Sequence, residues 1–148
     1  MPDPICRLLS EEDFEDAVSL YTELNGDSGI PLGDEGREQW CRLLSHPGTS
    51  IIGVEQDGLI VAMVTLHVMP NMTYEARPYA LIENVISSGK VRGQGFGKQV
   101  MQSAIDRAWE ANAYKVMLLT GKERGASGFY KSLGFNDEDK NGMVMWRM

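Results

Sequence analysis

A run rich in glycine in the middle of the chain is the stretch best suited to bind a ligand. It reads Val91-Arg92-Gly93-Gln94-Gly95-Phe96-Gly97-Lys98. Glycine lets a backbone approach a ligand closely because no Cβ stands in the way. We expect an amphipathic helix directly after it, and the first turn of a helix presents unpaired N–H groups and a partial positive charge. The run therefore predicts a binding site for a phosphate or pyrophosphate group.

Two common glycine-rich phosphate patterns do not fit this run. Counted from Gly93, the dinucleotide pattern G-x-G-x-x-G needs a glycine where Lys98 stands. The Walker pattern needs a glycine at Arg92 and a Ser or Thr at Gln99. A generic nucleotide-phosphate domain, in which ATP or NAD would compete for the site, is therefore disfavoured. The pattern that remains is Arg92-x-x-Gly95-x-Gly97.

The segments around the run alternate between strand and helix patterns. Apolar 3–4 spacing predicts helices over residues 11–24, 34–45, 97–111 and 127–133. Short runs rich in apolar and β-branched residues predict strands over residues 5–9, 50–55, 59–69, 79–86, 114–119 and 143–147. Gln56-Asp57-Gly58 predicts a hairpin, and the strand–helix–strand unit over 80–119 predicts a parallel pair with a right-handed crossover. We expect an α/β fold with a mixed central sheet of about 6–7 strands flanked by about 4 helices.

Length and composition narrow the class of protein. A chain of 148 residues predicts one domain over residues 1–148. The net charge of −7 argues against sequence-independent binding of nucleic acid, which needs basic residues, and is compatible with a cationic amine. No run approaches the 18 or so apolar residues of a membrane span, and the start does not resemble a signal peptide. Two cysteines without motif partners suit the cytoplasm, and no cluster has metal-ligand spacing.

Two motifs together resemble the GCN5-related N-acetyltransferase (GNAT) family. The glycine run is similar to that family's acyl-CoA loop, [RQ]-x-x-G-x-[GA]. About 30 residues later, Ser127-Gly128-Phe129-Tyr130-Lys131-Ser132-Leu133-Gly134-Phe135 looks like its A-x-x-F-Y-x-x-x-G-F segment. The order of predicted elements matches over nearly the whole chain, so the resemblance implies a single-domain GNAT-type fold. Leu81 to Val85 with Tyr114 to Val116 is also similar to the glucosamine-phosphate acetyltransferase-like branch.

The resemblance implies acetyl-CoA as the donor and assigns residues to it. Backbone N–H groups of the glycine run would hold the pyrophosphate, while Arg92 and Lys98 add charge-assisted contacts. Val85 and Ile86 would bind the pantetheine arm as an added strand, and an N–H there could polarise the thioester carbonyl. Ser127 is a further expected contact. One departure is the stretch Glu123–Ala126, which lacks the asparagine that many members use to hold CoA. The full set of predicted cofactor contacts is Val85, Ile86, Arg92, Gly93, Gln94, Gly95, Phe96, Gly97, Lys98 and Ser127.

Tyr130 and Glu83 are the candidate catalytic residues. The resemblance implies direct acetyl transfer to a primary amine in a ternary complex. A phenol with a pKa of about 10 can protonate a leaving thiolate whose pKa is about 8.5, so Tyr130 is the candidate acid. Glu83 stands inside an otherwise apolar strand, which is costly for a carboxylate unless it is paired, solvated or functional, so it is the candidate base. The alternatives are a core tyrosine, and a solvent-facing Glu83 or one paired with Arg77.

The acceptor and the assembly are less constrained by the sequence. Asn25 and Asp27, in the loop after the first helix, and Arg77 are candidate contacts to a small-molecule amine. His67 within a strand and His46 before a proline are interpreted as structural. The methionine-rich end suits either a homodimer contact or core packing. A competing hypothesis from another class is a non-catalytic acyl-CoA-binding or regulatory module, which would need the glycine run but neither Tyr130 nor Glu83.

Overall fold

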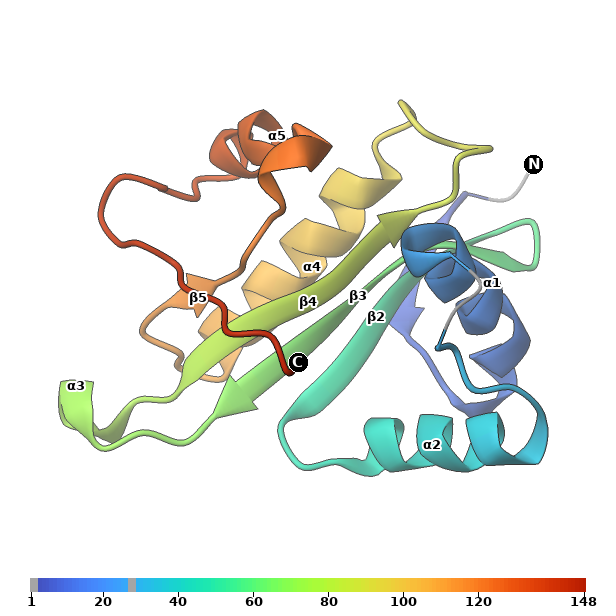
Figure 1. Ribbon diagram of the computed structural model, residues 1–148, viewed down its shortest axis with the longest axis horizontal. Coiled ribbons are helices and arrows are strands. Elements are labelled where there is room, and N and C mark those ends of the chain that lie inside the picture. The colour runs from blue at the N-terminus through green and yellow to red at the C-terminus, as the bar shows by residue number, and fades with distance from the viewer. Residues whose placement is uncertain (1–2, 27–28) are drawn as a thin grey trace.

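Five strands form one mixed sheet in the computed structural model, which describes residues 3–26 and 29–148. The strands lie in sequence order across the sheet (Figure 1): β1 (Ile5–Leu8), β2 (Thr49–Gln56), β3 (Leu59–Met69), β4 (Tyr79–Ser87) and β5 (Val116–Met117). The first three neighbouring pairs are antiparallel, and β4 and β5 are parallel, as the strand–helix–strand pattern predicts. Asp57 and Gly58, with φ of 52° and 81°, make the predicted hairpin turn between β2 and β3.

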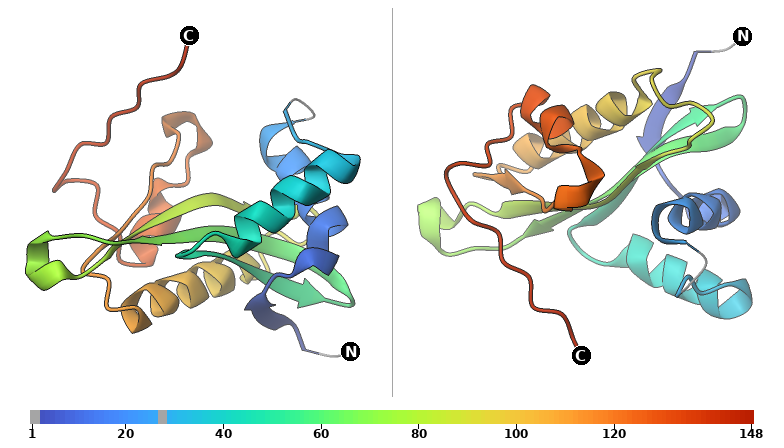
Figure 2. Two further views of the ribbon diagram at one scale, coloured as in Figure 1. Left: turned by 90° about the horizontal axis from the view of Figure 1, so that it is seen from below. Right: turned by 45° about the horizontal axis from the view of Figure 1, so that its top comes forward.

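Helices cover both faces of this sheet, which confirms the predicted α/β class. Figure 2 shows α1 (Phe14–Asn25) and α2 (Gly33–Ser45) on one face and α4 (Phe96–Glu110) on the other. The remaining helical segments are short: η1 (Glu11–Asp13), α3 (Thr73–Ala76), η2 (Lys122–Arg124) and α5 (Ser127–Ser132). None of the helices in the described residues is both long and apolar enough to cross a membrane.

The core consists of two apolar layers, one on each face of the sheet. Val100, Met101 and Ala104 of α4 are fully buried against the inner strands. On the other face, Phe14 and Trp40 anchor the cluster beneath α1 and α2. β3 contributes side chains to both layers, which is why it reads as a nearly continuous apolar run rather than an alternating one.

A buried carboxylate fixes the chain where it enters the first helix. Asp13 accepts the backbone N–H of Ser10 at 2.7 Å, and the Asp13 N–H bonds back to the Ser10 carbonyl at 3.0 Å. Arg7 of β1 donates to both carboxylate oxygens of Asp13, at 2.8 and 2.9 Å, and to Glu55 of β2 at 2.9 Å. These bonds tie the start of α1 to the edge of the sheet, and they hold the pKa of Asp13 below its usual range.

The predicted strand over residues 143–147 is wrong, and the sheet has five strands in the described residues instead of about 6–7. These residues are extended and exposed but have no neighbouring strand. The strand expected over 114–119 shrinks to Val116–Met117, because only these residues pair with β4. A strand exists only where another segment pairs with it, and an alternating or apolar pattern does not reveal whether such a partner is within reach.

Candidate active site

Strand β4 has a free edge in its second half. Its parallel pairing with β5 consists of Ala80 with Val116 and Leu81 with Met117. Among the described residues, no ladder pair continues between the two strands beyond this point. The edge of β4 that faces β5 therefore offers unpaired N–H and C=O groups from residue 82 onward, which suit an extended ligand added like another strand.

A bulge at Asn84 bends β4 within its unpaired half. Asn84 has a φ of 53°, which asparagine tolerates better than most residues. The register with β3 shifts here, so that Val64 opposes two residues of β4. After the bulge, Val85 packs toward α4 while Ile86 joins the core beneath α1. The predicted pantetheine contacts thus lie on a bent, partly unpaired piece of strand.

Glu83 directly precedes the bulge. Its side chain lies on the face of the sheet that α1 and α2 cover elsewhere. The neighbouring Ile82 packs toward α4, so strand alternation places Glu83 on the opposite side, where it is exposed. Directly across on β3 lies Thr65, which is 3% exposed. An exposed carboxylate at this position is open to an incoming amine.

The glycine loop connects the end of β4 to α4 and takes the backbone into the left-handed region. Gly93 and Gly95 both have a φ of 84°, and a Cβ at either position would meet no atom within 4 Å. These two glycines are therefore needed for backbone conformation, not for space. The first bond of the helix runs from the Gln99 N–H to the Gly95 carbonyl at 3.0 Å. The N–H groups of Phe96, Gly97 and Lys98 begin the helix and lack helical acceptors, which leaves them for an anion. The Gln94 N–H, in contrast, points to the Val91 carbonyl at 3.4 Å.

Gly97 is the glycine that permits close approach. A Cβ there would lie 3.0 Å from the Ser87 hydroxyl and 3.6 Å from the Phe129 ring. The end of β4, the start of α4 and α5 therefore meet around one glycine. The structure brings together the two sequence motifs, which lie about 30 residues apart along the chain.

Two charged side chains that the sequence analysis did not single out hold this region to α1. Glu23 accepts the Gly89 N–H at 2.6 Å and lies 3.6 Å from the Arg92 guanidinium, so it ties the glycine loop to α1. Arg124 donates to the Leu24 carbonyl at 3.4 Å and brings η2 to the end of the same helix. By pattern Glu23 is an ordinary exposed helix residue and Arg124 lies in a connecting stretch, so only the fold shows their partners.

Tyr130 lies in α5, half-buried among aromatic side chains. Its ring is edge-on to Phe129 and Phe135, with ring centres 5.2 and 6.1 Å apart. Burial raises the pKa of Tyr130, and the positive charge of Arg124 opposes that shift only in part. A raised pKa keeps the phenol protonated at neutral pH, which is the state that a proton donor requires.

The predicted acceptor residues do not gather at one place. Asn25 is exposed at the end of α1, and Asp27 lies outside the described residues. Arg77 donates to the carbonyls of Asn112 and Ala113 at 3.2 and 3.3 Å, at the far end of β4. Six residues of extended chain, about 20 Å, separate it from Glu83, so the alternative that these two residues form an ion pair does not hold. Ser127 is exposed at the start of α5.

Tyr21 of α1 is a polar residue near Glu83 that sequence reasoning missed. Its ring is edge-on to Trp40, and its buried hydroxyl has no hydrogen-bond partner within the described residues. Burial raises the pKa of Tyr21, while the hydroxyl of Thr65 nearby lowers it. Although Thr65 is close, the two hydroxyls do not meet hydrogen-bond geometry. The threonine within the apolar run of β3 is the signal that points to this polar spot.

The two histidines lie away from this region. Thr49 places its hydroxyl between His46 Nδ1, at 3.0 Å, and His67 Nδ1, at 2.9 Å, so both rings have structural partners. Groups of three or more metal-ligating side chains do not occur among the described residues.

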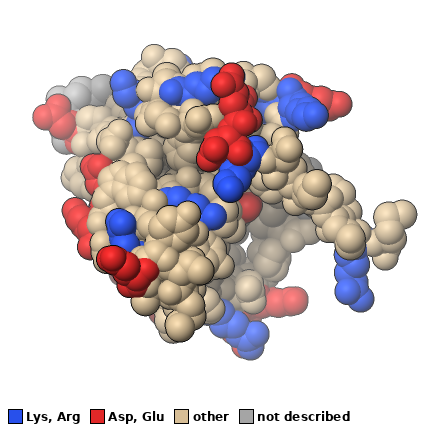
Figure 3. All heavy atoms as spheres, turned by 90° about the vertical axis from the view of Figure 1, so that its left-hand side faces the viewer, with Lys and Arg blue, Asp and Glu red and all other residues tan. Residues whose placement is uncertain are grey.

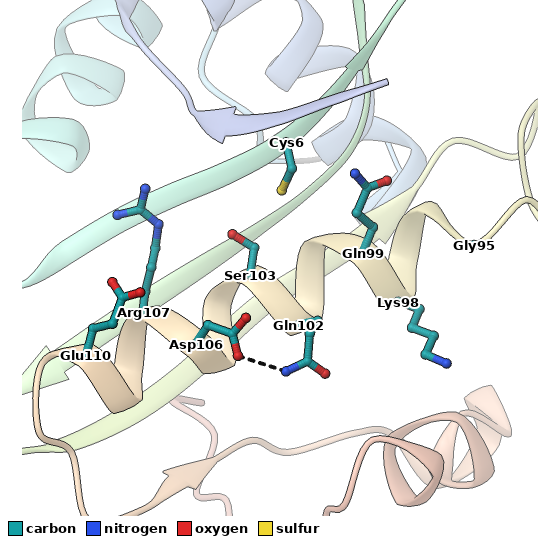
Figure 4. Close-up of a pocket in the computed structure, with 9 residues that line it drawn as sticks. All are labelled: Cys6, Gly95, Lys98, Gln99, Gln102, Ser103, Asp106, Arg107 and Glu110. Carbon is teal, nitrogen blue, oxygen red and sulfur yellow. Dashed lines mark hydrogen bonds between the residues drawn. The ribbon is translucent and has the colours of Figure 1, made fainter. Parts of the chain in front are cut away.

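A hollow of about 670 Å³ lies between α4 and β1, on the side of α4 that faces Cys6. Figure 4 shows Ser103 and Gln99 directed toward Cys6, and Lys98 directed to the other side of the helix. The hollow includes Gly95 and Lys98 at one end, but none of its lining residues belongs to β4 or α5. Glu83 and Tyr130 therefore do not line this hollow.

Comparison with known proteins agrees with this geometry. The family model described as "Acetyltransferase (GNAT) family" matches residues 12–135, which include the free edge, the glycine loop and Tyr130. The chain belongs to the GNAT acetyltransferase family. Members of this family use acetyl-CoA as acyl donor, and the chain is accordingly an acyltransferase.

Three similar proteins illustrate the range within this family. A putative acetyltransferase from Agrobacterium tumefaciens has a TM-score of 0.92 and 37% identity, covering 97% of this chain and 99% of that one. A glucosamine 6-phosphate N-acetyltransferase from Trypanosoma brucei brucei is 26% identical over 137 residues, covering 90% of each chain. A structure titled as a transcriptional regulator from Bacillus halodurans has a TM-score of 0.85 and 26% identity, covering 97% of this chain and 100% of that one.

Proposed function

We propose that this protein transfers the acetyl group of acetyl-CoA to the primary amine of a small molecule, directly and within a ternary complex. The observation that carries the proposal is the continuity of two binding surfaces. The free edge of β4 runs from Glu83 through Val85 and Ile86 and ends at the glycine loop, where α4 presents its unpaired N–H groups. A ligand with an extended amide arm and a pyrophosphate at one end matches both surfaces in that order.

The chain's own groups fit CoA at each position. The N–H groups of Phe96, Gly97 and Lys98 would hold the pyrophosphate, and the Lys98 ammonium is exposed beside them. Arg92 is 64% exposed at the side chain and shares Glu23 with Gly89, so it can turn to a phosphate oxygen. When bound, acetyl-CoA supplies the activated acetyl thioester. With the pyrophosphate at the glycine loop and the arm along β4, the thioester would lie toward Glu83.

Two side chains would move the protons. Glu83 would accept the proton of the incoming amine, directly or through a water, and expose its lone pair for attack. Tyr130, kept protonated by burial, would give its proton to the departing thiolate sulfur. A backbone N–H at Val85 or Ile86, on the edge of β4 that β5 leaves unpaired, would polarise the carbonyl under attack. No covalent bond to the protein is needed in this sequence.

The surface next to Glu83 would favour an acceptor with an apolar portion near its amine. Strand alternation puts Leu81 and Met117 on the same face as Glu83, and Met117 is 37% exposed. The protein's net charge of −7 favours a cationic acceptor over an anionic one. Arg77, which would have suited an anionic group, is occupied by backbone carbonyls far from Glu83.

The test is a titration of acetyl-CoA by calorimetry, followed by turnover against a panel of amines. The panel contains amino sugars with and without a 6-phosphate, because one relative is named for glucosamine 6-phosphate, together with aminoglycosides, polyamines and amino acids. Release of CoA that depends on both acetyl-CoA and one amine class supports the proposal. Absence of acetyl-CoA binding refutes it.

Tight binding without turnover on any amine would favour the non-catalytic module. The double variant Glu83→Gln with Tyr130→Phe is the matching check. A binding module needs neither side chain and should keep its affinity for acetyl-CoA, whereas an enzyme that uses both should lose turnover.

A further inference from the structure

One buried hydroxyl in the described part of the chain has no hydrogen-bond partner. It belongs to Tyr21 of α1, and its oxygen is shielded from solvent. Such a group gives up its bonds to water and gains none in exchange, so it lowers the stability of the fold. A phenylalanine would fill the same space without that cost. An unsatisfied hydroxyl of this kind therefore points to a role other than folding.

Packing alone holds this hydroxyl in place. The Tyr21 ring meets Trp40 edge-on, with ring centres 6.4 Å apart. Trp40 is 4% exposed and donates its indole N–H to the Ser10 carbonyl at 3.0 Å, so the ring against which Tyr21 rests is itself fixed. Burial raises the pKa of Tyr21, although the neighbouring Thr65 hydroxyl opposes the shift. The phenol is therefore a protonated donor at neutral pH.

Three polar side chains form a row from α1 over β3 to β4. The Tyr21 hydroxyl lies beside Thr65, which is 3% exposed. Thr65 opposes Glu83 directly in the antiparallel ladder. Facing residues of such a ladder share one face of the sheet and have Cβ atoms about 4.5–5.5 Å apart, so a threonine hydroxyl can reach a glutamate carboxylate. The row begins at a buried donor and ends at an exposed carboxylate.

Thr65 has the chemistry of a link between its two neighbours. A threonine hydroxyl can accept one hydrogen bond and donate another at the same time. Thr65 stands between Val64 and Leu66, which are both fully buried, so the polar group is exceptional within this strand. The Tyr21 and Thr65 hydroxyls are neighbours that do not meet hydrogen-bond geometry, so a rotation of either side chain is needed to join them.

The other end of the row is open to an incoming molecule. Glu83 is exposed, and in Figure 3 the last residues of the chain stand away from the body as an arm. Met143, in that last segment, is 90% exposed, and Figure 2 shows the segment running away from the sheet. The C-terminal segment therefore leaves Glu83 accessible.

We propose that Tyr21 is a positioning residue, which aims the Glu83 carboxylate through Thr65 when an amine occupies the site. The Tyr21 O–H donates to the Thr65 oxygen, and the Thr65 O–H donates to one carboxylate oxygen of Glu83. The other carboxylate oxygen is left to accept the proton of the amine. Without this chain, an exposed glutamate side chain samples many rotamers, and few of them face the amine. The inference rests on the proposed function, in which Glu83 is the base.

The first test measures unfolding by denaturant and needs no substrate. Tyr21→Phe should keep or raise the midpoint of unfolding, because it removes a hydroxyl that has no partner. Tyr114→Phe is the matched control, since Tyr114 stacks on Tyr74 with ring centres 4.0 Å apart and bonds to Pro78, before the start of β4. It should leave turnover unchanged. A lower midpoint for Tyr21→Phe would reveal a structural partner of the hydroxyl and overturn the proposal.

The second test measures kcat with the amine that the panel identifies. Tyr21→Phe and Thr65→Val should each lower kcat roughly 10- to 100-fold, while the dissociation constant of acetyl-CoA stays within about two-fold of wild type. Thr65→Ser keeps the hydroxyl and should retain most of the activity. Wild-type kcat in Tyr21→Phe, or an equal loss in Thr65→Ser and Thr65→Val, would overturn the proposal.

The decisive measurement repeats Tyr21→Phe in a chain that already carries Glu83→Gln. A residue that acts only by aiming Glu83 has nothing left to aim, so kcat should fall by no more than about two-fold further. A further fall as large as in the wild-type chain would mean that Tyr21 acts independently of Glu83, which contradicts the inference. If the wild-type protein turns over no amine, the proposed function fails and the inference with it. Turnover lost in Glu83→Gln but kept in Tyr21→Phe refutes the positioning role alone.

Discussion

Replacing Gly95 by alanine tests whether the glycine loop must keep its left-handed conformation to bind acetyl-CoA. Gly95 has φ 84° and ψ 8° at the N-cap of α4, and an added Cβ would meet no atom within 4 Å. The substitution therefore changes the backbone preference and leaves the packing intact. Any effect on the ligand then reports on conformation alone.

The magnitude follows from the cost of the left-handed region for an L-residue, about 1–2 kcal/mol. In the free protein the loop is exposed and can relax toward negative φ. Binding would then have to restore the left-handed turn, so the dissociation constant for acetyl-CoA should rise about 5- to 30-fold, since 1.4 kcal/mol corresponds to a factor of ten. The free energy of unfolding should fall by no more than the same 1–2 kcal/mol.

Gly58 provides the matched control. It lies in the hairpin between β2 and β3 with φ 81°, and a Cβ there also meets nothing within 4 Å. Gly58→Ala carries the same backbone cost away from the glycine loop, so it should lower stability similarly and leave the dissociation constant unchanged. Calorimetric titration with acetyl-CoA and chemical denaturation measure the two quantities. Wild-type affinity in Gly95→Ala, or equal weakening in both variants, would refute the assigned role of the loop.

Two stability predictions follow from buried features away from the site. Gly36→Ala should lower the free energy of unfolding, measured with denaturant, by roughly 1–3 kcal/mol. A Cβ on Gly36 would clash with the Pro31 carbonyl and lie 2.8 Å from Phe14, and this cost outweighs the better helix propensity of alanine. A variant more stable than the wild type would contradict this packing. Asp13→Asn should lower stability at neutral pH, because Arg7 depresses the pKa of Asp13 in the folded state. The lowered pKa stabilises the folded protein at pH values above the pKa of the unfolded carboxyl, and this stabilisation is lost as the pH falls. The difference in unfolding free energy between wild type and variant should therefore shrink below about pH 4. A difference that stays constant down to about pH 2 would argue against this role of Asp13.

The sequence predicts the parts of this fold that depend on local pattern. The long helix after the glycine loop, the hairpin at Asp57-Gly58 and the parallel pairing of β4 with β5 are all confirmed. Each has a local signal: apolar spacing, turn residues that accept positive φ, or a strand–helix–strand order that requires a crossover.

The errors concern features set by distant partners. The strand expected at residues 143–147 has no strand partner among the described residues, and β5 has two residues because its pairing with β4 stops at Leu81 and Met117. The contact of Glu23 with the glycine loop and the burial of Tyr21 join segments of α1 to regions more than 40 residues away. Such contacts leave no trace in a local pattern, whereas a single Asn in an apolar strand is at least compatible with a bulge.

The most direct test of the proposed chemistry is the turnover of Tyr130→Phe, compared with its affinity for acetyl-CoA, with the amine that the panel identifies. Phenylalanine keeps the ring among Phe129 and Phe135 and removes only the hydroxyl. If Tyr130 protonates the departing thiolate, kcat should fall by roughly 10²-fold or more while the dissociation constant of acetyl-CoA stays within about two-fold of wild type. An unchanged kcat would contradict the account and remove Tyr130 from the reaction.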